Sequence, residues 1–157
     1  MDSVVPSELP KGWQWVSHGA IAEINPKLPF DVADDTLVSF IPMPAVEAVS
    51  GQVDCSAIRK YAEVKKGYTQ FIDGDVILAK ITPCMENGKI AILKKLRNGI
   101  GCGSTEFHVS RPSQAVDGKY LFYYFSQERF RQEARRNMTG SAGQLRVPKR
   151  FFEQYPV

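Results

Sequence analysis

The chain has 157 residues, of which 43% are hydrophobic and 24% are charged, values typical of folded proteins and far from those of disordered ones. Its 20 Lys and Arg against 17 Asp and Glu leave a net charge of only +3, which by itself argues weakly against nucleic-acid binding. The charge is uneven along the chain: residues 1–58 carry two basic and eight acidic side chains, a net −6, and residues 59–157 carry the rest, a net +9. This asymmetry requires an explanation.

The apolar runs exclude a membrane-spanning protein. The longest runs, such as 120–125 and 76–79, fall far short of the roughly 20 residues that cross a bilayer. The first residues have neither the basic nor the apolar region of a signal peptide, so we expect a cytoplasmic protein. Three cysteines, Cys55, Cys84 and Cys102, match no zinc or disulfide spacing and are predicted to be reduced thiols.

The N-terminal third predicts short elements separated by loops. We expect a turn at residues 10–12, a short strand over 13–16, and a helical turn that ends before Asn25-Pro26, because proline disfavours helical geometry in the preceding residue. An acidic loop over 26–35 precedes a strand within TLVSFIPMP that ends at Pro42. Residues 45–67 predict a surface excursion that ends in the basic RKYAEVKKG.

The middle third predicts a β-hairpin. YTQFIDGDVILAKI combines a turn at Asp73-Gly74 with a buried strand in VILAKI. The loop TPCMENG contains the turn pair Asn87-Gly88 and leads to a second strand in KIAIL. The glycines of NGIGCGS permit close backbone approach or positive φ, and STEFHVSRP predicts another strand.

The last third predicts helices. KYLFYYFSQ is typical of an apolar helix, which we expect to continue through SQERFRQEARRNM, where Phe130, Ala134 and Met138 recur every four residues. After a flexible TGSAGQ, VPKRFFEQYPV predicts a short helix that begins at Pro148, followed by an extended exit. The expected fold is therefore mixed α+β, with a β-rich body closed by C-terminal helices.

Catalytic and metal-binding motifs are weak. Residues 25–28, Asn-Pro-Lys-Leu, begin like the Asn-Pro-Pro-aromatic motif of amino-methylating enzymes but lack its second proline and its aromatic residue. GIGCG lacks the ending of a phosphate-binding loop. His18 and His108 are predicted to be surface or hydrogen-bonded structural histidines, and Asp73 and Asp75 to bond turn backbone. We therefore expect no catalytic, cofactor or metal site.

Two basic stretches could contact a polyanion. In residues 80–97, strand alternation places Lys80 and Thr82 opposite Ile81, and the adjoining loop carries Asn87 and Lys89. Asn, Gln and Arg side chains can pair with base edges. A solvated sheet face would explain the same residues.

The second stretch, RFRQEARRNMTGSAGQLRVPKR, has seven bases and one acid. Hydroxyls and backbone amides of its Gly-Ser-Ala-Gly turn could contact phosphate while the basic side chains neutralise it. The arginine-rich helix could instead be a solvated face, or could pair with an acidic protein partner.

Four segments carry a family resemblance: LPKGWQWVSHGAIAEINP, DGDVILAKITPCMENGKIAIL, GCGSTEFHVSRP and YLFYYFSQERFRQEARRNMTGSAGQLRVPKRFFEQYPV. In order and spacing they resemble one target recognition domain of the specificity (S, HsdS-type) subunit of type I restriction-modification enzymes. The resemblance covers nearly the whole chain. It implies a domain that reads one half of a split site in double-stranded DNA.

The resemblance also implies partners and cofactors. Specificity subunits of this family hold two methyltransferase (M) subunits, which methylate adenine with S-adenosylmethionine, and the assembly recruits an ATP- and Mg-dependent restriction (R) subunit. Two recognition domains are joined there by long helices in a coiled coil. This sequence ends at Tyr155-Pro156-Val157 without such a spacer helix, so we expect coiled-coil contacts to be weakened or lost.

We therefore predict one noncatalytic DNA-recognition domain over residues 1–157, with the acidic segment turned away from phosphate or toward protein partners. Base choice is expected to rest more on residues 45–70, with help from side chains such as Asn87 and Gln144. The alternatives are the recognition part of a fused methyltransferase-nuclease and a basic protein-interaction module. The predicted DNA contacts come from the two basic stretches and their loops: Lys80, Thr82, Asn87, Lys89, Ser141, Gln144, Arg146, Lys149 and Arg150.

Overall fold

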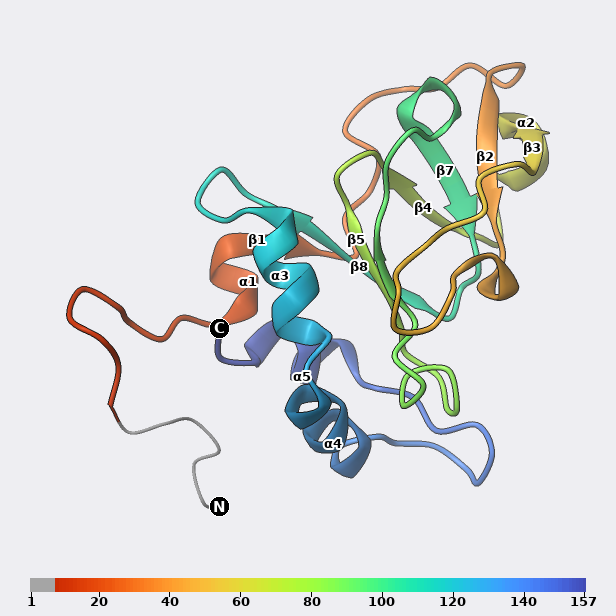
Figure 1. Cartoon of the computed structure of the whole chain (residues 1–157). Coiled ribbons are helices and arrows are strands. Elements are labelled where there is room, and N and C mark those ends of the chain that lie inside the picture. Colours follow the sequence, from red (N-terminus) through yellow and green to blue (C-terminus); the bar gives the residue numbers. More distant parts are fainter. Residues whose placement is uncertain (1–7) are drawn as a thin grey trace.

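The computed structural model describes residues 8–157; residues 1–7, where the signal-peptide features were sought, lie outside the described part. Two four-stranded sheets form the body (Figure 1). The first sheet is antiparallel throughout, in the order β1 (Ala22–Ile24), β8 (Phe107–Pro112), β5 (Val76–Ala79), β6 (Ile90–Ile92). The second has the order β3 (Ile58–Lys60), β2 (Leu37–Ile41), β7 (Ile100–Gly103), β4 (Thr69–Ile72), and only its β2–β7 pair is parallel.

The helices are short and lie mainly beside the first sheet (Figure 1). In residues 8–157 no helix is long and apolar enough to cross a membrane, and the longest, α4, has nine residues. The helices are α1 (His18–Ile21), α2 (Tyr61–Val64), α3 (Gly118–Phe125), α4 (Glu128–Arg136) and α5 (Lys149–Gln154), with 3-10 turns η1 (Met43–Ala45) and η2 (Arg97–Gly99).

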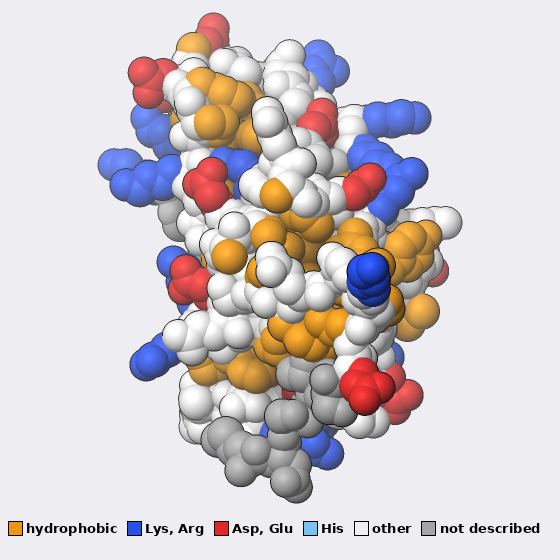
Figure 2. All heavy atoms as spheres, turned by 90° about the vertical axis from the view of Figure 1, so that its left-hand side faces the viewer, with side chains coloured by type: hydrophobic (Ala, Val, Ile, Leu, Met, Phe, Trp, Pro, Cys, Tyr) orange, Lys and Arg blue, Asp and Glu red, His pale blue; other side chains and the backbone are white. Residues whose placement is uncertain are grey.

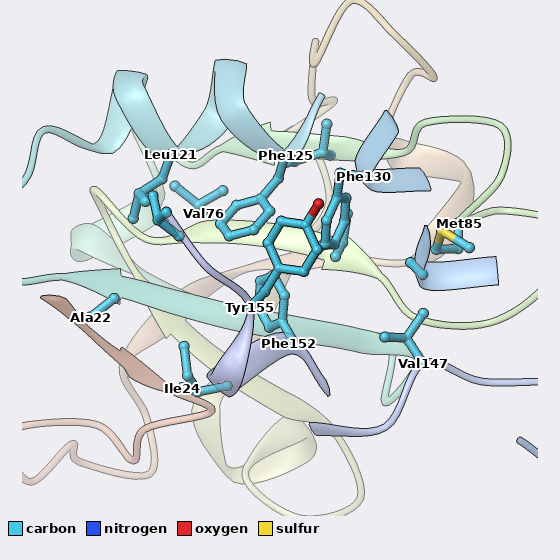
Figure 3. Packing of buried hydrophobic residues seen from close by; sticks show 14 residues of the cluster. Ala22, Ile24, Val76, Met85, Leu121, Phe125, Phe130, Val147, Phe152 and Tyr155 are labelled. Carbon is cyan, nitrogen blue, oxygen red and sulfur yellow. The ribbon is translucent and has the colours of Figure 1, made fainter. Parts of the chain in front are cut away.

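Strand alternation divides the core into layers. In β5, Val76 and Leu78 pack in the cluster on the helix side, whereas Ile77 packs in the cluster between the two sheets. The helix-side cluster is dominated by aromatic rings, with Phe125, Phe130 and others brought together from α3, α4 and α5 (Figure 3). The first sheet is therefore buried on both faces.

Two glycines of β7 allow close contacts with its neighbouring strands in the second sheet. A Cβ at Gly101 would lie 2.5 Å from the Phe71 ring, and one at Gly103 would lie 2.0 Å from the Ile41 carbonyl oxygen. No larger residue fits either position without moving the backbone or the ring. The close approach that NGIGCGS permitted in the sequence is thus realised, although the segment is itself a strand, which the sequence reasoning did not predict.

Several predicted elements are confirmed. The strand ending before Pro42 is β2, and VILAKI and KIAIL contain β5 and β6, which pair as an antiparallel hairpin. STEFHVSRP contains β8, and the last helix begins after Pro148 as expected. These elements are short, and their signals lie within or immediately beside them.

Other predictions are wrong in detail. Residues 13–16 form no strand; Val16 exchanges two backbone hydrogen bonds with Val157 instead. The helical turn stops at Ile21, because residues 22–24 pair with β8 as β1. The predicted long C-terminal helix is two helices, since Gln127 is extended (φ −66°, ψ 140°) and caps α4.

The predicted surface excursion over 45–67 is partly structured. It contains β3 and α2, and Val46 and Val64 are buried in two different clusters. Val46 faces the space between the sheets, whereas Val64 covers the outer face of the second sheet together with Val38 and Cys102. Burial of these two side chains fixes the segment to the body.

Candidate nucleic-acid interface

The structure brings the two predicted contact loops together. Ile81 and Arg146 form an antiparallel bridge. On either side of it the Thr82 amide donates to the Leu145 carbonyl (2.9 Å) and the Val147 amide donates to the Lys80 carbonyl (2.8 Å). Figure 1 shows both loops projecting at the same corner of the molecule, beyond the first sheet. One continuous surface therefore carries residues from both stretches.

The second loop is a compact hairpin. Thr139 and Arg146 exchange two backbone hydrogen bonds of 3.0 and 2.9 Å. Gly140 has a φ of 124°, and a Cβ there would lie 2.7 Å from the Gln144 carbonyl oxygen, so the turn requires glycine. Ser141 and Gln144 are both exposed on this turn. Their side chains are thus presented to solvent on a backbone held at its base.

The first loop is anchored through its middle. The Met85 side chain is fully buried in the helix-side cluster, while Asn87, two residues on, is exposed. The Thr82 hydroxyl donates to the Glu86 carboxylate (2.7 Å), which also lies 3.5 Å from the Arg135 guanidinium. Thr82 therefore stabilises the loop, and Asn87 is the side chain that the loop presents.

The guanidinium of Arg146 is held in place by Glu106. Its Nε and Nη2 donate to the two carboxylate oxygens at 2.8 and 2.7 Å, and Nη1 donates to the Gln144 carbonyl (3.2 Å). These hydrogen bonds, with the charges of Arg146 and Lys80, lower the pKa of Glu106. Arg146 is thus a cation held in a fixed position, and the guanidinium edge that can donate two parallel hydrogen bonds is already used by Glu106.

The remaining predicted cations differ in their availability. Lys149 and Arg150 are exposed in the first turn of α5. Lys80 is half-buried next to the Ile81–Arg146 bridge, and its backbone amide donates to the Glu106 carbonyl (2.8 Å). Lys89 points elsewhere, because its ammonium donates to the Met43 carbonyl (3.1 Å) at the 3-10 turn η1.

Both histidines are buried beneath this surface or beside it, as hydrogen-bonded structural residues. The His108 Nε2 donates to the Val147 carbonyl (2.7 Å), and its Nδ1 accepts from the Asn25 side-chain amide (3.1 Å). The His18 Nδ1 donates to the Phe152 carbonyl (3.0 Å), and its Nε2 accepts from the Ser110 hydroxyl (2.6 Å). Burial lowers the pKa of each histidine to about 4.

The acids of the predicted turn also have structural partners. Asp75 is fully buried and forms a bidentate ion pair with Arg111 (2.9 and 2.8 Å), while the Asp73 carboxylate accepts from the Leu96 amide (3.0 Å). Within residues 8–157, no group of three or more His, Cys, Asp or Glu side chains could hold a metal ion. Burial raises the pKa of the Cys102 thiol to about 11.

A hollow of about 630 Å³ lies on the side of the molecule opposite the two loops. It is lined mainly by apolar and aromatic side chains, including Trp13, Trp15, Val116 and Tyr120. Figure 2 shows hydrophobic side chains gathered over the middle of this face. Such a lining does not suit phosphate, so the loop surface is the candidate interface.

Sequence reasoning missed Glu106, which orients Arg146. Its only local signal is its place in GSTEF, immediately before β8; its partner lies 40 residues later in the chain. His108 was correctly predicted to be structural, but its role in holding residue 147 against the first sheet depends on the same long-range arrangement.

No protein-family model matches the chain. It is similar to two curated proteins of Escherichia coli, the type I restriction enzyme EcoAI and EcoEI specificity subunits, with 51% and 47% identity over 154 residues. Each alignment covers 97% of this chain and 26% of the relative, so the chain spans about a quarter of the length of these relatives.

Two solved structures have a similar fold. A chain from the type I R-M system, in a structure that describes complex assembly and conformational transition, has a TM-score of 0.73 at 21% identity. The HsdS subunit from Thermoanaerobacter tengcongensis has a TM-score of 0.72 at 19% identity. Each comparison covers 97% of this chain and 39% of the other. These structures confirm the α+β fold class inferred from the sequence, and the two curated relatives confirm the resemblance.

Proposed function

We propose that this chain, whose homologues are specificity subunits of type I restriction enzymes, recognises one half of a bipartite DNA site without itself catalysing a reaction. In this proposal it acts in the cytoplasm together with methyltransferase subunits and a restriction subunit. S-adenosylmethionine for adenine methylation, and ATP with Mg, would be bound by those partners. The observation that carries the proposal is the backbone pairing of the two polar, basic loops into one surface.

The exposed loop side chains suit the reading of bases. Asn87 and Gln144 each carry an amide with donors and an acceptor, the groups that pair bidentately with adenine in the major groove. Both project from loops whose backbones are fixed by hydrogen bonds, so little conformational freedom would be lost on binding. We assign base contacts to these two residues, with Ser141 beside them.

The cations around the loops suit contact with phosphate. Lys149 and Arg150 are exposed, and Lys80 and Arg146 lie beside the bridge between the loops. Glu106, the acid beside the bridge, is already paired with Arg146. Lysine and arginine contacts with phosphate fix the position of a protein on DNA and supply most sequence-independent affinity.

That a single recognition domain extends over residues 1–157 stays a prediction.

The test uses the natural protein that carries this sequence, assembled with its methyltransferase subunits. Mapping the adenines that become methylated identifies the site, and duplexes with and without that site then measure binding. We expect Asn87→Ala or Gln144→Ala to relax preference at particular base pairs. Lys149→Ala or Arg150→Ala should weaken binding to all sequences and lower its salt dependence.

Lys11→Ala is the matched control, because Lys11 is exposed on the turn at residues 10–12, on the opposite side of the molecule from the loops. Unchanged affinity and unchanged site choice in all four loop and α5 variants would refute the proposed interface. Absence of binding to duplex DNA even at low salt would favour the alternative of a basic module that binds an acidic protein.

A further inference from the structure

A polar groove adjoins the surface that carries the two loops. It has a volume of about 320 Å³ and lies between β4, the start of β8 and the loop after β1. Lys80, already assigned to the loop surface, also lines this groove. The two features are therefore continuous. Its polar lining also includes Lys27, Tyr68, Thr69, Gln70 and Thr105. We call this feature the β4–β8 groove.

Asn25 fixes one wall of the groove. It directly follows β1 and has a φ of 52°. Its backbone amide donates to the Val109 carbonyl, and its side-chain oxygen accepts from the Val109 amide, both at 2.7 Å. Its side-chain amide also donates to His108. Arg111 then donates to the Lys27 carbonyl (2.9 Å). Four hydrogen bonds thus hold the short loop that places Lys27 at the groove, and the Asn-Pro-Lys sequence has a positioning role.

The opposite wall comes from β4 and the turn before β8. Thr69 pairs with Gly103 in the second sheet, and Tyr68, directly before it, is 42% exposed. Thr105 is exposed between Gly103 and Glu106. Since Glu106 holds Arg146 and its carbonyl accepts from the Lys80 amide, this wall runs directly into the loop surface.

The lining has the composition of a phosphate site. Lysines with Thr, Gln and Tyr side chains are the groups that contact phosphate oxygens in protein–DNA complexes. The residues that line the groove include two lysines and no Asp or Glu. Glu106, whose neighbour Thr105 lines the groove, is paired with Arg146. An anionic group entering the groove would therefore meet uncompensated positive charge.

We propose that the β4–β8 groove binds backbone phosphates of the same DNA duplex whose bases contact the two loops. The proposal rests on the proposed function and extends the interface from the first sheet onto the second. Lys27 and Lys80 supply the charge, and Thr69 and Thr105 supply hydroxyl donors. Because the contacts are to the backbone, the groove contributes affinity and register, with no choice between bases.

The test measures duplex affinity against salt concentration for the natural protein in its methyltransferase complex. The variants are Lys27→Ala and Thr105→Val, with Lys27→Arg to restore the charge and Lys11→Ala as the control at an exposed lysine outside the groove. The probes are a fluorescent duplex with the mapped site and a scrambled duplex. Lys27 and Thr105 are both exposed, so equal melting temperatures will confirm that the variants fold.

We expect Lys27→Ala to reduce the slope of log affinity against log salt by about 0.9, equally for both duplexes. Between 50 and 200 mM salt, this variant would lose about 3.5-fold less affinity than the unmodified protein. Lys27→Arg should restore the slope, and Thr105→Val should weaken binding to both duplexes without changing the slope.

Three results would overturn the proposal. If Lys27→Ala behaves like Lys11→Ala while Lys149→Ala loses salt dependence, the groove makes no contact but the proposed function stands. If Lys27→Ala changes the preferred base at one position, the groove reads bases and the backbone assignment is wrong. If Lys149→Ala is also without effect, the proposed interface fails together with the groove.

Discussion

Lowering the pH from 7 to 5 is expected to destabilise the fold markedly, through two histidines. His18 and His108 have 0% and 3% of their surface exposed, and burial lowers the pKa of each from 6.5 to about 4. As the pH falls through 6.5 the unfolded chain takes up protons that the folded chain does not. The stabilisation is therefore complete above pH 6.5 and is lost as the pH falls toward 4.

The hydrogen bonds explain why the folded state resists protonation. His108 accepts from the Asn25 amide at Nδ1, so a proton there would face another donor. The Ser110 hydroxyl beside His18 can rotate, but that ring is packed between Phe125 and Phe152, with centroids at 4.7 and 4.5 Å. The charged forms are thus penalised by lost hydrogen bonding in one case and by desolvation in both.

The lowered pKa values imply that the free energy of unfolding falls by about 2 kcal/mol for each histidine between pH 7 and 5, or by about 4 kcal/mol together. For a chain of this length that lowers the melting temperature by roughly 10 °C. Glu106 adds little in this window, because its pKa is lowered and its contribution is lost only below its ordinary value of 4.5. The histidines should therefore dominate.

Thermal unfolding at pH 7, 6 and 5 measures the loss of stability, and NMR of the imidazole rings measures the pKa of each histidine in the folded chain. The 157-residue chain has only two histidines, so each ring signal can be followed separately. A melting temperature that stays constant from pH 7 to 5, or ring signals that titrate near 6.5 in the folded chain, would refute the reasoning.

Two further predictions concern packing and the interface. Gly103→Ala should lower the free energy of unfolding by about 3 kcal/mol or more, because the new Cβ would lie 2.0 Å from the Ile41 carbonyl oxygen. Chemical unfolding measures this loss, and Gly118→Ala, whose Cβ would have its nearest neighbour at 3.5 Å, is the control. Equal stabilities of the two variants would contradict the prediction. Arg146→Ala should weaken duplex binding more than Lys149→Ala, because it removes a cation and also leaves the Glu106 carboxylate unpaired near phosphate. Duplex affinity is measured for both variants in a salt titration. Comparable losses of affinity would show that Glu106 does not face the DNA.

Elements with local signals were predictable from the sequence. The β5–β6 hairpin has Asn87-Gly88 in its connection, and α5 begins after Pro148, where a fixed φ and a missing amide favour a helix start. The strand β7 was missed because its glycines have low strand propensity. They are required there by the Phe71 ring and the Ile41 carbonyl, which are remote in sequence.

The interface was predictable in part. Composition and the family resemblance identified both loops, but no local pattern indicates that residue 81 pairs with residue 146. For the same reason the partner of Arg146 could not be inferred. The charge asymmetry does not divide the molecule into two sides, since residues 1–58 contribute β1 to one sheet and β2 to the other. Charge is instead distributed locally, by ion pairs such as Asp34–Lys65 (2.8 Å).

The bridge between residues 81 and 146 has a consequence for how this surface can change over time. The hydrogen bonds that join the loops run between backbone atoms of residues 80, 82, 145 and 147, and they do not depend on which side chains those residues carry. Substitutions at exposed positions such as Asn87 and Gln144 would leave the junction intact. One backbone arrangement could therefore accommodate successive side-chain sets, and a lineage could acquire a new target by a few point substitutions without passing through an unfolded intermediate sequence.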